Sequence, residues 1–146
     1  MSYFEHLDIY LNQLNNFING RVTAENFVDE FFRLWKIDRD EESLEFKDHV
    51  NDPNHPLLVK LRANEITSDE FGNLAGMLLG MSETQARIRS VQDRIFTTCD
   101  CFWPDTTDDE ADPPLVLSEK LFRAEIMELF QELELLCSTK NHQTNV

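Results

Sequence analysis

Acidic side chains gather in one short segment of this sequence, PDTTDDEADPP at positions 104–114. Five acids fall within eight residues there, and no lysine or arginine occurs between Thr97 and Glu119. These acids are Asp105, Asp108, Asp109, Glu110 and Asp112. A chain with 28 acidic residues can contain such a run by composition alone, but a run without nearby compensation repels itself. Because carboxylates form charge-assisted hydrogen bonds with arginine and lysine, the segment predicts contact with a basic partner.

Metal binding is the main alternative use of these acids and of the nearby cysteines. The acidic segment lacks the central glycine and the glutamate at the twelfth position that an EF-hand calcium loop requires. Cys99 and Cys101 would need two further ligands to hold structural zinc, and no second cysteine pair exists. On a helix these two thiols point about 200° apart, which places one in the core and the other outside it. We therefore predict no metal and no other cofactor.

No arrangement typical of an active site occurs in the chain. Its four glycines form neither of the phosphate-binding patterns GxGxxG and GxxxxGKS, and its four histidines form no HExxH or ExxH motif. A hydrolase that uses two carboxylates is also disfavoured. Such an enzyme needs two neighbouring acids whose surroundings give them different pKa values, and the sequence does not identify such a pair. The sequence thus favours a binding protein without catalytic residues over an enzyme.

Aromatic residues precede the acidic segment. Phe102 and Trp103 stand directly before Pro104. Exposed aromatic rings beside charge are typical of the energetic centres of protein interfaces, although a core position for Phe102 is equally compatible with its type. We predict that Trp103 is partly exposed and belongs to the binding site.

Apolar residues at spacings of three and four predict that helices carry these side chains. The first helix is expected from about Tyr3 to Asn19, with Gly20 ending it. Its predicted core stripe comprises Phe4, Leu7, Leu11, Leu14 and Ile18. A second helix, capped by Thr23, is expected to reach the late thirties or beyond, and residues 38–46 to continue it as a solvated, highly charged end.

The rest of the chain contains a break, further helical segments and the acidic loop. The prolines of NDPNHP at 51–56 interrupt any helix. The helical segments predicted after it are a turn at 57–62, a segment capped by Thr67 or Ser68, a helix from Ser82 that ends before Pro104, and a last helix capped by Ser118. No window alternates with the period of a strand, so we predict an all-α fold, an antiparallel helical bundle of four to five main helices. It forms one domain at 1–137 with a surface loop at 104–114, followed by a polar, disordered tail at 138–146.

The overall charge limits the class of partner. The chain has 28 Asp and Glu against 13 Lys and Arg, a formal net charge of −15. Its field repels phosphate backbones and anionic membranes and attracts a strongly basic protein. The N-terminal residues lack a signal-peptide pattern, and no window approaches the roughly 18 apolar residues of a membrane span, so we expect a cytoplasmic protein that binds neither nucleic acid nor membrane. In that compartment the three cysteines are expected to be reduced thiols.

Three blocks of the sequence carry a family resemblance. They are VTAENFVDEFFRLWKIDRD at 22–40, IFTTCDCFWPD at 95–105 and LSEKLFRAEIMELFQEL at 117–133, together about a third of the chain. In this order they resemble the immunity proteins of the colicin D type, including relatives that protect against contact-dependent toxins. The middle block is the most specific, because the family pattern there combines an apolar helix face, an acid, and then an aromatic residue, proline and aspartate.

The resemblance implies a helical bundle that binds the nuclease domain of a toxin and covers its active site. In that family acidic side chains stand in for the phosphates of a tRNA substrate. Asp100 and Asp105 match the acidic positions of the family pattern and would face the basic catalytic groups of the toxin, and the other loop acids would extend the contact. The implied partner is a cognate basic nuclease toxin, bound by one monomer. Residues 46–84 have no counterpart in the shortest family members, so their role is open.

An acidic helical chaperone or adaptor for a secreted protein is the alternative function. Proteins of that class are also small and acidic. A toxin inhibitor would bind a folded nuclease tightly and abolish its RNA cleavage, whereas a chaperone would hold an unfolded segment and leave the activity intact.

Overall fold

The computed structural model describes the backbone of residues 2–49 and 52–144, with the side chains in these ranges except those of 2, 68, 69, 73 and 139–144. Helices and connecting loops make up this described part, which contains no strand. The helices are α1 (Ser2–Glu5), α2 (Leu7–Ile18), α3 (Ala24–His49), α4 (Pro56–Arg62), α5 (Ser68–Leu78), α6 (Glu83–Asp100) and α7 (Glu119–Thr144). The predicted all-α class is confirmed.

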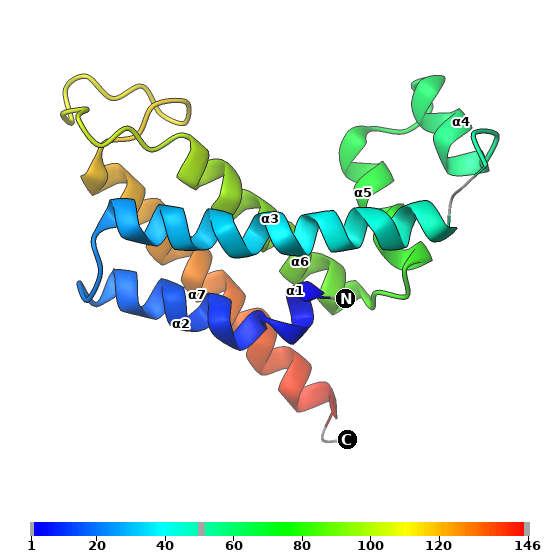
Figure 1. Ribbon diagram of the computed structural model, residues 1–146, viewed down its shortest axis with the longest axis horizontal. Helices are drawn as coiled ribbons and strands as arrows, with labels where there is room; N and C mark the ends of the chain where they lie inside the picture. Colours follow the sequence, from blue (N-terminus) through cyan, green and yellow to red (C-terminus); the bar gives the residue numbers. More distant parts are fainter. Residues whose placement is uncertain (1, 50–51, 145–146) are drawn as a thin grey trace.

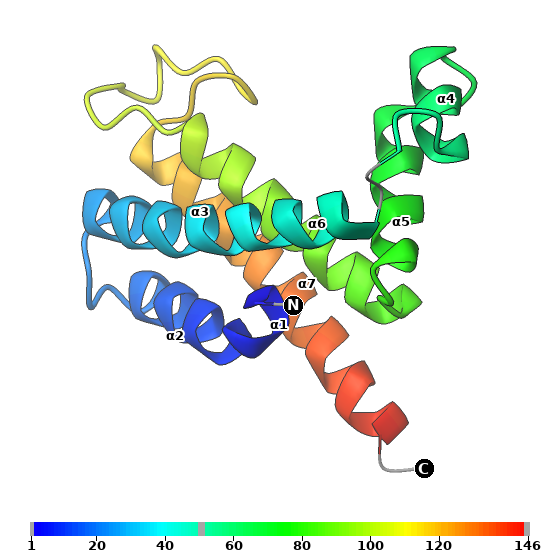
Figure 2. The ribbon, with the colours of Figure 1, turned by 45° about the vertical axis from the view of Figure 1, so that its right-hand side comes forward.

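Two helical hairpins form the body of the protein (Figure 1). Helices α2 and α3 run antiparallel in contact with each other, and so do α6 and α7. The second hairpin crosses the first, with α7 against α2 and α6 against α3. Helices α4 and α5 stand apart from this body near the end of α3, where α5 contacts α6 (Figure 2). The bundle of four to five main helices is therefore confirmed, with α2, α3, α6 and α7 in its body.

Local sequence signals begin and end several helices at the expected residues. Gly20 has a φ of +73°, a left-handed conformation that glycine adopts without steric cost, and the chain reverses there between α2 and α3. Thr67 caps α5 through a capping box with Glu70. Ser82 caps α6 in the same way with Gln85. In both boxes the cap hydroxyl accepts from the backbone N–H three residues on, and the side chain of that residue accepts from the backbone N–H of the cap. These two hydrogen bonds set where the helix begins.

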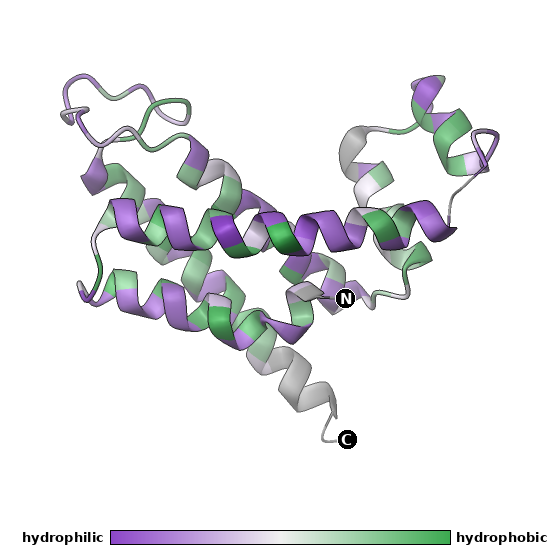
Figure 3. Ribbon diagram, in the orientation of Figure 1, coloured by the Kyte–Doolittle hydropathy of each residue, from purple (hydrophilic) through white to green (hydrophobic). Residues whose placement is uncertain are grey.

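An aromatic cluster fills the space between the two hairpins. The Phe17 ring stacks on Phe27 with centroids 4.7 Å apart, and Phe122 of α7 lies close to both rings. Phe102, at the start of the loop before α7, stacks on Phe122 at 4.5 Å. Of the two positions left open for Phe102, the structure shows the core one. Hydrophobic and hydrophilic residues alternate along the long helices, as amphipathic helices around a core require (Figure 3).

The first predicted helix differs from the structure in two ways. A break at His6 divides it into α1 and α2. In α2 the fully buried side chains are Tyr10, Leu14 and Phe17, so only Leu14 of the predicted stripe is fully buried. The cause is that α2 contacts both α3 and α7, and the side chains that point between two partner helices are buried most deeply.

The long helices extend further than predicted. Helix α7 continues to Thr144 through most of the segment expected to be disordered, because that segment contains no glycine or proline to end a helix. Residues 145 and 146 of that segment lie outside the described residues. Helix α3 continues to His49, and the predicted turn at 57–62 is α4. None of the described helices combines the length and the apolar composition needed to cross a bilayer.

Candidate functional site

The acids predicted to bind a partner lie at one end of the bundle, where the chain crosses from α6 to α7 (Figure 1, upper left). Asp100 is the last residue of α6, and 101–118 form the connecting loop. The predicted acids Asp100, Asp105, Asp108, Asp109, Glu110 and Asp112 are all exposed. Trp103 is 58% exposed, which confirms its predicted partial exposure. The structure thus brings every residue of the predicted site to one helix end and the loop that follows it.

Backbone hydrogen bonds anchor both ends of this loop. The Leu117 N–H donates to the Cys101 carbonyl at 2.8 Å, and the Trp103 N–H donates to the Leu117 carbonyl at 3.1 Å. Asp112 and Val116 exchange two hydrogen bonds of 2.9 Å. Because these contacts close the base of the loop, its acids are presented from an anchored segment of chain.

Two of the predicted binding acids have partners inside the chain. The Ser118 hydroxyl donates to Asp108 Oδ1 at 2.5 Å, and the Thr107 hydroxyl donates to Glu110 Oε1 at 2.8 Å. Since Ser118 directly precedes α7, the Asp108 carboxylate also lies near the positive end of that helix. Asp108 and Glu110 therefore help to hold the loop in place, a role that their position in the sequence does not distinguish from binding.

The other four predicted acids have no side-chain hydrogen bond or ion pair with the side chains that the structure describes. They are Asp100, Asp105, Asp109 and Asp112. With Trp103 they combine free carboxylates and an exposed aromatic ring on one segment. An arginine guanidinium pairs with carboxylates through two parallel hydrogen bonds and also stacks on aromatic rings. The arrangement is therefore suited to contact arginine side chains of another protein.

Of the two cysteines beside this segment, Cys99 is in the core as predicted, whereas Cys101 packs against the core instead of lying outside it. Cys99 is buried and Cys101 is half-buried, and the chain's three cysteines are free. Burial raises the pKa of the Cys99 thiol, and the neighbouring charge of Asp100 raises it further, so this thiol is a poor nucleophile. In the part of the chain that the structure describes, no three His, Cys, Asp or Glu side chains are grouped to hold a metal ion.

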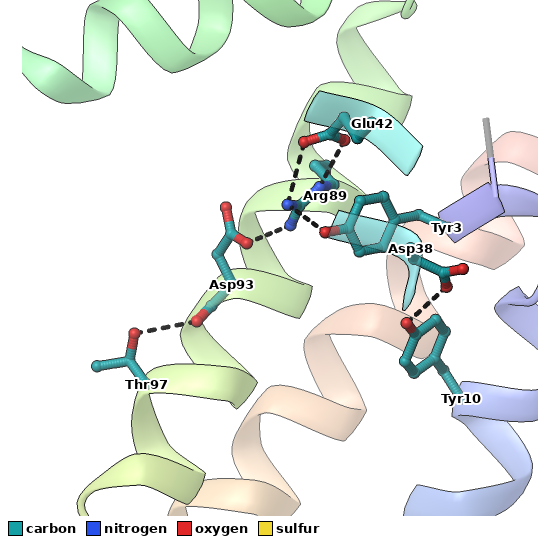
Figure 4. Close-up of polar contacts among 7 residues, drawn as sticks. All are labelled: Tyr3, Tyr10, Asp38, Glu42, Arg89, Asp93 and Thr97. Carbon is teal, nitrogen blue, oxygen red and sulfur yellow. Dashed lines mark hydrogen bonds and ion pairs between the residues drawn. The ribbon is translucent and has the colours of Figure 1, made fainter. Parts of the chain in front are cut away.

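A second polar cluster lies in the interior, among α1, α2, α3 and α6 (Figure 4). Asp38 of α3 is fully buried, and its carboxylate accepts a hydrogen bond of 2.7 Å from the Tyr10 hydroxyl. The other carboxylate oxygen lies 2.8 Å from Nδ1 of His6. Burial raises the pKa of Tyr10, and the hydrogen bond to Asp38 raises it further. The prediction of a solvated helix end at 38–46 is wrong at its first residue, because Asp38 meets partners from the N-terminal helices.

Arg89 of α6 is the centre of the same interior cluster (Figure 4). Its guanidinium donates to both Glu42 carboxylate oxygens, at 2.9 and 3.2 Å, and to the Tyr3 hydroxyl at 2.7 Å, and it pairs with Asp93. It also lies over the Tyr3 ring, 3.6 Å from the centroid. Burial would lower the pKa of Arg89, but the hydrogen bond to Glu42 and the charges of Asp93 and Glu42 raise it. With these donors occupied, Arg89 joins α1, α3 and α6.

A cleft of about 900 Å³ opens beside Arg89, between the end of α3, α5 and α6. Its lining includes Phe46 and Phe71, whose rings meet edge to face at 5.8 Å. The charged groups of Glu42, Arg89 and Asp93 on its wall are paired with one another. These three side chains are therefore engaged within the protein rather than available to a charged ligand.

The two clusters differ in what they can do for a partner. The interior cluster has a buried centre in Tyr3, Tyr10 and Asp38, and its charged groups are paired within the protein. The acids of the loop cluster are exposed, and four of them have no partner among the described side chains. Comparisons with models of protein families, with curated proteins and with solved structures find no match for this chain. The acidic loop with Asp100 and Trp103 is the candidate binding site on the physical grounds of charge, exposure and missing partners.

Proposed function

We propose that this chain is an immunity protein that binds and neutralises a basic nuclease toxin of the tRNA-cleaving class. The observation that carries the proposal is a group of four exposed acids without partners among the described side chains, beside the exposed Trp103. Asp100 ends α6, and Asp105, Asp109 and Asp112 lie on the anchored loop. Carboxylates placed against catalytic arginine and lysine side chains occupy the positions of substrate phosphates through charge-assisted hydrogen bonds. In this role the chain acts in the cytoplasm, binds one toxin domain as a monomer and catalyses no reaction itself.

The net charge supports the same proposal through the rate of association. A protein of charge −15 attracts a strongly basic domain over distances of about a Debye length, roughly 8–10 Å at physiological salt. Such steering raises the association rate and makes it fall with ionic strength. Rapid capture is what protection against a nuclease requires, because the toxin acts until it is bound.

The test takes as candidate toxin the C-terminal domain of the protein encoded next to this chain, purified with and without the chain. Asp100 and Asp105 are changed together to asparagine, which keeps the shape and removes both charges. We expect the double variant to weaken binding by about 2–5 kcal/mol, the usual loss for desolvated charge pairs across an interface. Calorimetry measures the affinity, and an RNA cleavage assay measures the inhibition.

The matched control removes two charges elsewhere. Glu30→Gln with Glu134→Gln changes exposed acids of α3 and α7 that lie outside the loop. It should bind the toxin as the unchanged chain does, apart from a small effect on association rate. Full inhibition by the Asp100 and Asp105 variant would show that the binding site is elsewhere. Binding of only unfolded toxin, with cleavage intact, would favour the chaperone alternative instead.

A further inference from the structure

A groove of about 400 Å³ lies between α6 and α7, beside the base of the acidic loop. Thr98 and Cys101 at the end of α6 line one side, and residues of α7 line the other. Pro113 and Pro114 of the acidic loop also contribute to its lining. Helices α6 and α7 lie side by side in this part of the molecule (Figures 1 and 2). The groove is thus continuous with the loop that carries the candidate site.

The floor of the groove is apolar and its rim is acidic. Leu117 and Leu129, which line it, are 4% and 6% exposed. Glu125, Glu128 and Glu132 follow at intervals of three and four residues along α7, so they share one face of that helix. All three glutamates are exposed. The groove therefore combines apolar surface with carboxylates along one edge.

Only one of these glutamates is neutralised among the described side chains. Arg94 of α6 pairs with Glu132 from the opposite wall. Glu125 and Glu128 have no side-chain hydrogen bond or ion pair within the described ranges. The Arg94 contact shows that an arginine beside this groove can reach the acidic edge of α7.

A long basic side chain matches both parts of the groove. Its methylene groups can lie against Leu117 and Leu129 while its charged end meets Glu125 and Glu128, as lysine and arginine do on mixed surfaces. The lining carries three acids against the one base Arg94, so charge complementarity favours a cationic occupant. The volume is near the lower end for ligand pockets, about 300–1,000 Å³, which suits extended side chains better than a whole helix.

We propose that the groove between α6 and α7 receives a lysine- or arginine-bearing segment of a basic protein partner. This inference rests on the proposed function, because it adds a second contact surface to the same toxin, next to the acidic loop. The loop would engage the catalytic groups of the toxin, and the groove would hold a basic segment at the edge of its active site.

A peptide titration tests the groove without the toxin. The isotope-labelled full chain is titrated with tri-arginine, and with tri-alanine as the uncharged control, while NMR follows the backbone amides. Shift changes should appear at 125–132 on α7, in addition to those that binding to the unpaired acids of the loop site produces. Glu125→Gln with Glu128→Gln should raise the apparent Kd about tenfold, because it removes two ion pairs that are partly exposed to water. The control, Glu30→Gln with Glu134→Gln, should leave the Kd unchanged. The absence of shift changes at 125–132, shift changes there no larger than on the acidic surface outside the loop, or shift changes there that the groove variant leaves unaltered would overturn the proposal.

A second measurement uses the toxin and separates the two proposals. Thr98→Phe fills the groove without changing its charge, and circular dichroism confirms that this variant folds. Both Thr98→Phe and the Glu125 and Glu128 variant should bind the toxin about tenfold more weakly and keep residual binding through the loop. Toxin binding as tight as that of the Glu30 and Glu134 control would overturn the groove proposal and leave the proposed function standing. If the unchanged chain does not bind the toxin, the proposed function fails, and the peptide titration still decides whether the groove takes cations.

Discussion

The interior cluster and the acidic loop use the same residue types in opposite ways. Asp38 is fully buried and contacts Tyr10 and His6, whereas Asp105 and Asp109 are exposed and have no partner in the described part of the chain. A buried charge without a partner costs several kcal/mol, so each charge in the interior has a compensating group. At the loop, water solvates the carboxylates, and they can remain unpaired until another protein arrives. The comparison separates the charges that hold the fold from those available for binding.

Removal of Arg89 should have the largest effect on stability. Arg89→Met keeps the length of the side chain but leaves Glu42 and Asp93 without their cation, so we expect the free energy of unfolding to fall by about 3 kcal/mol. Arg87→Met is the control, because Arg87 lies on the same helix and forms an exposed pair with Glu83 at 3.0 Å. The control should lose at most about 0.5 kcal/mol. Equal losses in urea denaturation would contradict a special role for the interior cluster.

Neutralisation of Asp38 should have the next largest effect. Asp38→Asn keeps the size but removes the charge that faces His6 and weakens the hydrogen bond from Tyr10, so we expect a loss of about 2 kcal/mol in the free energy of unfolding. Asp40→Asn on the same helix changes a side chain that is 72% exposed and should cost less than about 0.5 kcal/mol. A similar unfolding midpoint in the two variants would show that the buried carboxylate does not stabilise the fold.

Alkaline pH should weaken the interior cluster and not the loop. The pKa of Tyr10 is raised in the folded chain from its ordinary value near 10, so the unfolded chain loses this proton at lower pH than the folded one. The stability linked to Tyr10 is therefore complete below about pH 10 and is lost as pH rises toward the folded pKa, at up to about 1.4 kcal/mol per pH unit. Urea denaturation between about pH 8 and pH 11 measures how the free energy of unfolding falls with pH. This fall should be less steep for Tyr10→Phe than for the unchanged chain. If the free energy of unfolding falls equally steeply with pH in both proteins, Tyr10 is not the group responsible for the loss of stability.

The loop acids should have the smallest effect on stability and a measurable effect on binding kinetics. Asp109→Asn with Asp112→Asn removes two unpaired charges, so the free energy of unfolding should change by less than about 0.5 kcal/mol. Toxin association should become slower and less dependent on salt. Asp108→Asn should instead lower stability by about 1 kcal/mol, because the Asp108 carboxylate accepts from Ser118. Stopped-flow kinetics at low and high salt measure the association rate, and thermal unfolding measures the stability. If the Asp109 and Asp112 variant and the Asp108 variant change both quantities equally, the loop acids do not divide into binding and anchoring groups.

Helix boundaries were predictable where the signal is local. Gly20, the capping box of Thr67 and that of Ser82 act on backbone groups within a few residues, so their neighbours in the sequence suffice to place them. The break at His6 was not predictable in the same way. The His6 ring contacts Asp38, which is 32 residues away, and the Tyr10 hydroxyl contacts the same carboxylate from 28 residues away.

The candidate site was predicted in location but not in detail. A run of acids without a basic residue marks an exposed loop, because no core could accommodate so many unpaired carboxylates. The division of its acids into anchoring and unpaired groups depends on contacts such as that from Ser118 to Asp108. The groove beside the loop was not predicted at all, since Glu125 and Glu128 read as ordinary solvated residues until α6 and α7 are placed together.

By itself, the sequence determined the all-α class, the net charge of −15 and the presence of an exposed acidic loop. These properties follow from composition and from spacing within a few residues, which act before any distant contact forms. The tertiary structure decided which charges are paired. Arg89 and Glu42 are 47 residues apart, and only the packing of α3 against α6 brings them within hydrogen-bond distance.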